Sequence, residues 1–378
     1  LKIFFLMLCM ILVSCTGQKT GKENDNNDKI AIEVGEIKFP PQDVLQLKSY
    51  YLSSSVHVDS IDYLIGYNYR LHSLDCMNLK SKSVTQIVLP GDGPDAIVRL
   101  SGIYAQSLDS VWISDESERA FLIDSVGTIK RMIDLKKYLE DQEQLLINTN
   151  YAMFTSHLFY NASRHSLMFL VKHTPSNTFI VKEAFIDEVG KMATYQLSSS
   201  KVVPDMSKGY AYINFPNVNF VGENIVYNYP VESSIYMLDI RTNERKYILA
   251  DSHYTSNIIE KCTTSGDYAT LEKHWLENSH FYDIMYLPKY KIYARLHADK
   301  VDFDEKKGME KLINERDLYL MLFDENMEKI GETKLSNCRY SPFTSWNATY
   351  GGIALFVDNV LDEKNNTDDL TIDIISLK

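Results

Sequence analysis

The amino-acid sequence predicts an all-β fold: a β-propeller of six blades, each made of four antiparallel strands. Three observations favour this architecture. A hairpin pattern recurs along the 378 residues, further apolar segments precede each copy, and the last copy lacks one strand that a segment near the N-terminus can supply. A ring of repeated four-stranded units protects the sheet edges that an open arrangement would leave exposed.

Each hairpin copy is an apolar alternation that ends in an aspartate, followed by a polar turn and a second alternation. The copies begin at Phe121, Ala184, Tyr236 and Leu320, with a looser one at Ser73. Their aspartates are Asp75, Asp124, Asp187, Asp239 and Asp324. An aspartate can accept hydrogen bonds from the backbone N–H groups of a turn. We therefore interpret all five as turn residues and not as catalytic groups.

Additional strands lie upstream of the hairpins. Second strands are expected from Ile61, Ser110, Ser166, Asn224, Lys291 and Gly352, and first strands in segments such as Asn150–Asn161 and His280–Pro288. The last copy ends in LTIDIISLK, which supplies only a third strand. Its fourth strand is expected from the segment Lys29–Pro40, so that the two ends of the chain pair and close the ring.

Two β-sandwich domains are the alternative fold. They would require a linker near the middle of the chain. Ser198–Gly209 is the only candidate, and it lies between two copies as the other connections do. The sequence therefore favours a single propeller domain over residues 29–378.

The N-terminus predicts export and lipid anchoring. Lys2 is followed by an apolar run from Ile3 to Val13, which is too short to span a bilayer. The run ends in Leu-Val-Ser-Cys, which resembles the bacterial lipobox. We expect residues 1–14 to be a lipoprotein signal peptide, Cys15 to be lipidated, and residues 15–28 to be a disordered tether. The expected location is the outer membrane, with the chain facing the periplasm or the cell surface.

The segment from Gly91 to Ile133 resembles a known blade pattern. It contains GDGPDAI, then DSVWISD from Asp109, then an IDSVGTI hairpin from Ile123. It is similar to the six-bladed, TolB-like propellers of Bacteroidetes lipoproteins, although Asp95 and Thr128 replace the usual glutamate and lysine. The chain length, lipobox and overall layout also resemble the DUF4221 lipoprotein family. The resemblance implies a propeller and carries over no catalytic residues.

Composition and charge limit the partners. The formal net charge is -12 and the pI is about 5.3, which disfavours nucleic acid and anionic membrane surfaces. We expect contact with the membrane through the N-terminal lipid only, a monomer, and an unknown protein or carbohydrate partner. Cys76, Cys262 and Cys338 have no zinc-binding spacing, so no metal and no cofactor are expected.

Function is expected on one face of the ring. In a four-stranded meander, the second-to-third turns and the inter-blade connections share a face. That face carries the long connections, which are Lys136–Thr149, Ser198–Gly209, Asp251–Ser279 and Asp299–Arg316. Long loops on a rigid scaffold often bind ligands. His274 and Trp275, with His280, are the candidate binding residues there, and we expect the histidines to be exposed loop residues.

The sequence favours a non-catalytic binding module. No metalloprotease, serine hydrolase or phosphate-loop motif occurs in it. The alternative is a propeller enzyme that acts on a glycan or a lactone at the channel mouth. Convergent carboxylates in the channel would favour the enzyme, whereas a channel filled by apolar side chains would favour the binding module.

Overall fold

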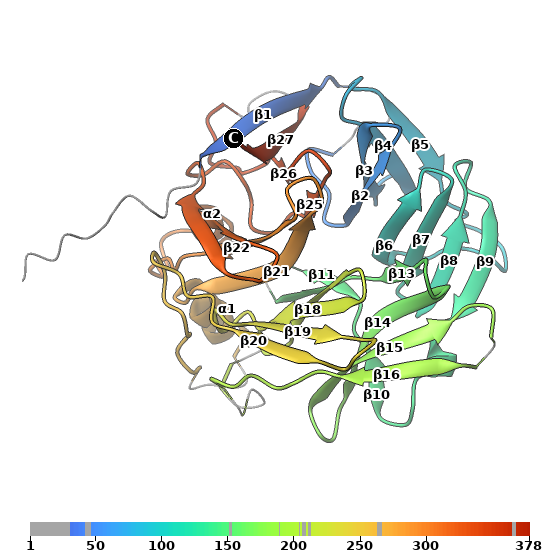
Figure 1. Cartoon of the computed structure of the whole chain (residues 1–378). Helices are drawn as coiled ribbons and strands as arrows, with labels where there is room; N and C mark the ends of the chain where they lie inside the picture. The colour runs from blue at the N-terminus through green and yellow to red at the C-terminus, as the bar shows by residue number, and fades with distance from the viewer. Residues whose placement is uncertain are drawn as a thin grey trace, which may run out of the picture.

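The computed structural model describes residues 31–41, 47–150, 153–188, 190–203, 205, 209–210, 213–262, 267–364 and 368–378. In these residues, six small sheets surround a common axis and form a six-bladed β-propeller (Figure 1). The predicted fold class is confirmed, and the two-sandwich alternative is wrong. The expected signal peptide, Cys15 and tether lie outside the described residues.

Four blades are meanders of consecutive strands. They are blade 1 (β2 Ser53–Val58, β3 Ile61–Asn68, β4 Ser73–Asn78, β5 Val84–Val88), blade 2 (β6 Leu100–Ser107, β7 Ser110–Asp115, β8 Arg119–Ile123, β9 Ile129–Asp134), blade 4 (β17 Asn217–Val221, β18 Asn224–Asn228, β19 Ile235–Asp239, β20 Arg245–Ile248) and blade 5 (β21 His280–Leu287, β22 Ile292–Ala298, β23 Leu318–Phe323, β24 Lys329–Lys334). Each recurring hairpin of the sequence forms the third and fourth strands of a blade.

Blade 6 closes the ring by pairing the two ends of the chain. Its strands are β25 Trp346–Ala348, β26 Ile353–Phe356, β27 Leu370–Leu377 and, outermost, β1 Ile32–Phe39. β1 runs antiparallel to β27, with Ile32 opposite Leu377 and Phe39 opposite Leu370. Figure 1 shows β1 beside the C-terminus. The closure predicted from the segment Lys29–Pro40 is confirmed.

Blade 3 departs from the simple meander. Its long strands are β14 Ser166–His173, β15 Thr178–Phe185 and β16 Met192–Gln196, and the inner edge of β14 pairs with two short strands, β10 Glu143–Leu145 and β13 Phe159–Asn161. Between these two, β11 Asn148–Asn150 and β12 Phe154–Ser156 form a hairpin. The prediction of one continuous strand over Asn150–Asn161 is therefore wrong.

The β11–β12 hairpin crosses the centre of the ring. β12 adds to the inner edge of blade 4, where Ser156 lies opposite Val218, and the hairpin also contacts β6 and β21. Its base packs on Gly102 of β6. A Cβ atom at Gly102 would lie 2.7 Å from Ile147 Cγ2 and 3.3 Å from Leu158 Cβ, so the close approach requires glycine.

The core is divided among the blade interfaces. One apolar cluster fills each interface between neighbouring blades; for example, Leu74, Ile87, Ile113 and Phe121 lie between blades 1 and 2. The cluster between blades 3 and 4 is extended by Trp275, Leu276, Leu312 and Ile313, which come from connections on one face of the ring. Packing of blade against blade thus explains why each strand is apolar on its buried side.

In the described residues, three short helices interrupt the connections. They are the 3₁₀ helix Leu135–Tyr138, α1 Tyr268–Leu276 and α2 Met309–Asn314. α2 lies within the long connection Asp299–Arg316, and α1 lies in the connection Asp251–Ser279, where the histidines were expected in a loop. Asp267 caps α1 by accepting a hydrogen bond from the backbone N–H of Ala269.

The turn role predicted for the hairpin aspartates is correct at three positions. Asp124, Asp239 and Asp324 each accept backbone N–H bonds from the following turn. It is wrong for Asp75, which lies within β4 and is fully buried, and Asn78 caps that turn instead. Asp187 pairs with Arg131 of the neighbouring blade, at 3.1 Å.

Candidate functional site

A pocket of about 750 Å³ opens at the mouth of the central channel, above blades 1 and 2. We call it the mouth pocket; its lining residues are Tyr51, Leu52, Tyr67, Tyr69, Arg99, Leu100, Ser101, Glu116, Ile147 and Phe343. In blades 1 and 2 these residues lie where first strands begin and second strands end. That places the pocket on the face that carries the inter-blade connections, which is the face the sequence predicted for function.

Buried polar contacts hold the blade 1 wall. The hydroxyl of Tyr50 donates to the buried carboxylate of Asp75 at 2.7 Å, and the ring of Tyr50 lies where a Cβ atom on Gly66 would be. The backbone N–H of Tyr67 donates to the carbonyl of Leu52 at 2.9 Å. Asp75 thus fixes the segment that presents Tyr51 and Leu52 to the pocket.

The blade 2 wall is built by the segment that resembles the known blade pattern. The loop of GDGPDAI is held by Arg119, which donates to the carbonyl of Ala96 at 2.8 Å and pairs with Asp115 at 2.5 Å. At the end of this loop Arg99 reaches the pocket rim and pairs with Glu116, with Nε and Oε1 3.5 Å apart. The motif residues therefore support a pair of opposite charges at the opening.

The opposite wall ends at Phe343, behind which lies Trp275. The two rings stack with their centroids 5.8 Å apart, and the guanidinium of Arg316 lies 4.7 Å from the Trp275 ring. Arg316 also donates to the carbonyls of Trp275, Asn278 and Asp299, which joins the end of α1 to the blade 5 insertion. The long connections of blades 4 and 5 thus form a cover over one side of the channel mouth.

The candidate binding residues from the sequence are inside this cover. His274, Trp275 and His280 are 9%, 3% and 0% exposed, so the expectation of exposed loop residues is wrong. The indole N–H of Trp275 donates to Nδ1 of His280 at 3.2 Å, and Nε2 of His274 contacts the carbonyl of Glu260. Trp275 does not line the mouth pocket, but its ring stacks on Phe343, which does.

The rim of the mouth pocket carries charges of both signs. Burial raises the pKa of Tyr51, and the nearby Tyr69, Asp358 and Glu310 raise it further. Burial also raises the pKa of Asp358, to about 6, so this carboxyl still carries negative charge at neutral pH. Besides the Arg99–Glu116 pair, the rim therefore has acidic groups near Tyr51 and a basic group near Tyr69, where the guanidinium of Arg70 lies 6.0 Å from the ring centroid.

Asp283, on the inner strand of blade 5, is a paired carboxylate. Asp283, on the bulged strand β21, is 2.9 Å from Nε2 of His157 and accepts a hydrogen bond from the indole N–H of Trp346 at 3.3 Å. The Asp283 side chain is 2% exposed. Both of its oxygens are engaged, so it serves as a contact between inner strands of different blades.

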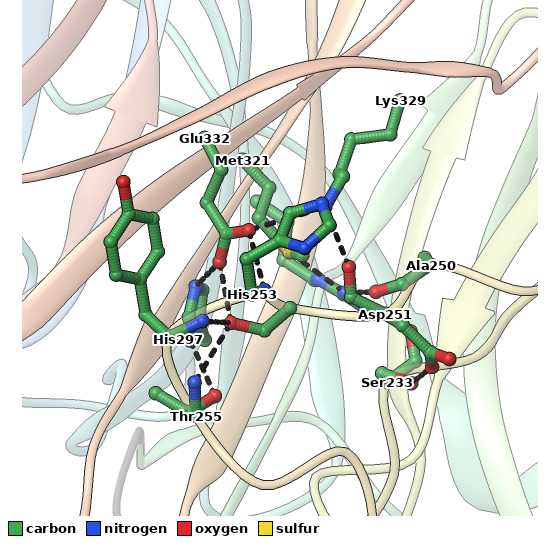
Figure 2. A network of polar contacts seen from close by, with 12 residues as sticks. Ser233, Ala250, Asp251, His253, Thr255, His297, Met321, Lys329 and Glu332 are labelled. Carbon is green, nitrogen blue, oxygen red and sulfur yellow. Dashed lines mark hydrogen bonds and ion pairs between the residues drawn. The ribbon is translucent and has the colours of Figure 1, made fainter. Parts of the chain in front are cut away.

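A second polar network lies at the junction of blades 4 and 5 (Figure 2). Glu332 accepts hydrogen bonds from His297 at 2.8 Å, from Ser252 at 2.5 Å and from the backbone N–H of His253 at 3.0 Å. Nδ1 of His297 then accepts from the hydroxyl of Thr255, at 3.2 Å. Thr255, His297 and Glu332 resemble a nucleophile, a base and its orienting acid.

Burial argues against catalysis at this network. His297 and Glu332 are both 0% exposed, and burial lowers the pKa of the histidine. Arg295, also fully buried, donates to the carbonyls of Ser233 and Ala250. The network ties the connection between blades 4 and 5 to strands β22 and β24, which is a structural role.

The described residues contain no cluster of metal ligands and no membrane-spanning helix. Among the residues that the structure describes, no three His, Cys, Asp or Glu side chains lie together as a metal site would require. No helix in the described ranges is long and apolar enough to cross a membrane. The thiols of Cys76 and Cys262 are buried and that of Cys338 is partly exposed, and none of these three described cysteines forms a disulfide.

The fold and the mouth pocket define a six-bladed β-propeller protein with a ligand-sized opening at its axis. Residues 23–334 match the family described as "Domain of unknown function (DUF4221)". The chain belongs to this family, as its motifs suggested.

Two solved structures share the fold. One is a DUF4221 member from Bacteroides vulgatus, with 14% identity and a TM-score of 0.73, covering 93% of this chain and 99% of that one. The other is a protein of Bacteroides fragilis predicted to be exported, with 13% identity, a TM-score of 0.54, and coverage of 93% and 97%. No curated protein sequence matches the chain.

Proposed function

We propose that this protein is a lipid-anchored binding module of the cell envelope and that its ligand binds in the mouth pocket. The proposal is carried by one observation: the segment from Gly91, which resembles the known blade pattern, supports the blade 2 wall of the pocket. Its volume is within the range of roughly 300–1,000 Å³ typical of ligand sites. The lipobox and the related exported protein of Bacteroides fragilis support a location in the envelope.

The alternative is an enzyme that acts on a glycan or a lactone. Hydrolysis of a glycosidic bond uses two carboxyl groups roughly 5–10 Å apart. Of the described residues that line the mouth pocket, Glu116 is the only carboxylate, and it is paired with Arg99. The pocket therefore supports binding better than hydrolysis.

The site is tested by ligand-induced stabilisation of the full-length chain. A panel of oligosaccharides, peptides and small metabolites should contain a class that raises the melting temperature, because a ligand at 100 times its Kd stabilises a protein by about 2.7 kcal/mol. The double variant Arg99→Ala with Glu116→Ala should reduce this shift. Arg131→Ala with Asp187→Ala, which removes another exposed ion pair, is the control. An unchanged shift in the first variant would reject the mouth pocket as the site.

The anchor is tested separately at Cys15. Cys15→Ala should prevent acylation, because the thiol is the point of lipid attachment in a lipobox. The variant should then leave the detergent phase in a phase-partition experiment. A variant that still partitions with the parent would show that the lipobox interpretation is wrong.

A further inference from the structure

Two large aromatic rings are exposed side by side on the rim of the mouth pocket. Tyr51 is 58% exposed and Tyr69 is 50% exposed, although both line the same opening. Tyr51 lies two residues before β2 and Tyr69 directly after β3, and these two strands are paired with Ser53 opposite Gly66. Tyrosines combine a wide apolar face with a hydroxyl group, and they are enriched where proteins bind ligands.

The polar groups of the rim suit an uncharged ligand. Arg99 and Glu116 form a balanced pair whose side chains are 74% and 57% exposed, so together they can donate and accept hydrogen bonds. Acidic Asp358 and Glu310 act on Tyr51, and basic Arg70 lies 6.0 Å from the ring centroid of Tyr69, so the rim has no excess of one charge that would select an anion. A cationic ligand would compete with Arg99.

The floor beneath these groups is apolar and fixed. Leu52 and Leu100 are 5% and 6% exposed. Tyr67 is 7% exposed, and its hydroxyl is held by Nδ1 of His72 at 3.0 Å. A floor that is already ordered costs little conformational entropy when a ligand binds.

Taken with the proposed function, on which this inference rests, we propose that the mouth pocket binds a neutral carbohydrate chain. Sugar rings have apolar C–H faces that stack on Tyr51 and Tyr69. Their hydroxyl groups donate to Glu116 and accept from Arg99. A sugar ring combines an apolar face with hydroxyl groups at its edge, which matches the tyrosines and the Arg99–Glu116 pair of the rim. A peptide matches the rim less well, because its charged groups and its apolar groups are on separate side chains.

The test uses the full-length chain and neutral hexasaccharides. Maltohexaose, mannohexaose, xylohexaose and N-acetylchitohexaose are titrated by calorimetry, with oligogalacturonate as the anionic arm and a lysine-rich peptide as the cationic arm. We expect binding to at least one neutral chain. Tyr51→Ala and Tyr69→Ala should each weaken it about tenfold, the usual effect of truncating a central aromatic contact. Both rings are exposed, so the melting temperature of the free protein should hardly change.

Tyr268→Ala is the matched control. Tyr268 lies on α1, is 68% exposed and does not line the pocket, so its truncation should leave affinity unchanged. If the protein binds only the peptide or only oligogalacturonate, and Tyr69→Ala abolishes this binding, the ligand is not a neutral carbohydrate. The mouth pocket would then remain the binding site. If a neutral chain binds and neither tyrosine variant weakens its binding, both the carbohydrate inference and the assignment of the mouth pocket as the binding site are wrong. No binding of any neutral chain at 10 mM would overturn the inference.

Discussion

Glu332 shows how one buried carboxylate supports the fold. Burial alone would raise its pKa, but hydrogen bonds from His297, Ser252 and the backbone of His253 lower it from 4.5 to about 2. A carboxyl whose pKa is depressed in the folded state stabilises the protein above its unfolded pKa. This contribution is therefore present above pH 4.5 and is lost as the pH falls towards 2.

Replacing Glu332 by glutamine tests the effect of this lowered pKa on stability. Glu332→Gln should lower the free energy of unfolding at pH 7 by roughly 3 kcal/mol, and it should flatten the stability profile between pH 4.5 and 2. Denaturant unfolding at a series of pH values measures both effects. Glu328→Gln, at an exposed residue of the β23–β24 turn, is the control and should match the parent. If Glu332→Gln keeps the acid sensitivity of the parent in this window, another group is responsible for it.

Single residues were predicted correctly where chemistry is local. Asp124, Asp239 and Asp324 cap the turns that follow them, because the carboxylate and its N–H donors are neighbours in sequence. Asp75 has the same pattern, but its partner Tyr50 lies 25 residues away. The role of Asp75 depends on tertiary contacts, which the local pattern does not contain.

Strand β1 closes the ring as the outermost strand of blade 6. Its Phe39 is fully buried, and its Glu36 accepts a hydrogen bond from Arg339 at 2.9 Å. Arg339 also pairs with Asp373 of β27, which joins the two chain ends through one side chain.

Removing β1 should therefore open blade 6. Deletion of residues 29–40 exposes the edge of β27 and should lower the free energy of unfolding by roughly 2 kcal/mol or more, the value of one buried phenylalanine. Thermal and denaturant unfolding measure the loss. Deletion of residues 16–28, of similar length, is the control and should have no effect. Equal stability of the two truncated proteins would contradict closure by β1.

The sequence predicted most strands but not the broken inner strand of blade 3. Strand alternation and turns are local signals, and blades built from them were recognisable. The β11–β12 hairpin depends on a contact with Gly102, about 45 residues earlier in the chain. Helix α1 was missed because its buried residues pack on the propeller and follow no clear helical period.

For the whole molecule, the ring and its elaborated face were predictable and the mouth pocket was not. The count of strands and the missing last strand were enough to predict closure. The pocket combines residues from blades 1 and 2, the β11–β12 hairpin and the connection before β25. These positions are brought together only by the circular arrangement, so Trp275 was chosen and the tyrosines of the rim were missed.

The most direct test of the mouth pocket as the binding site is to block it by chemical labelling, so that the same protein is measured with the pocket open and then blocked. Ser101→Cys, made in a Cys338→Ser background, places a thiol on the pocket wall for reaction with a bulky maleimide. Ser81→Cys, in the exposed β4–β5 turn, is the matched control. Calorimetry before and after labelling measures binding to whichever oligosaccharide or peptide the parent binds. The account predicts that labelling at position 101 abolishes binding and that labelling at position 81 does not; full binding by the protein labelled at position 101 would contradict it.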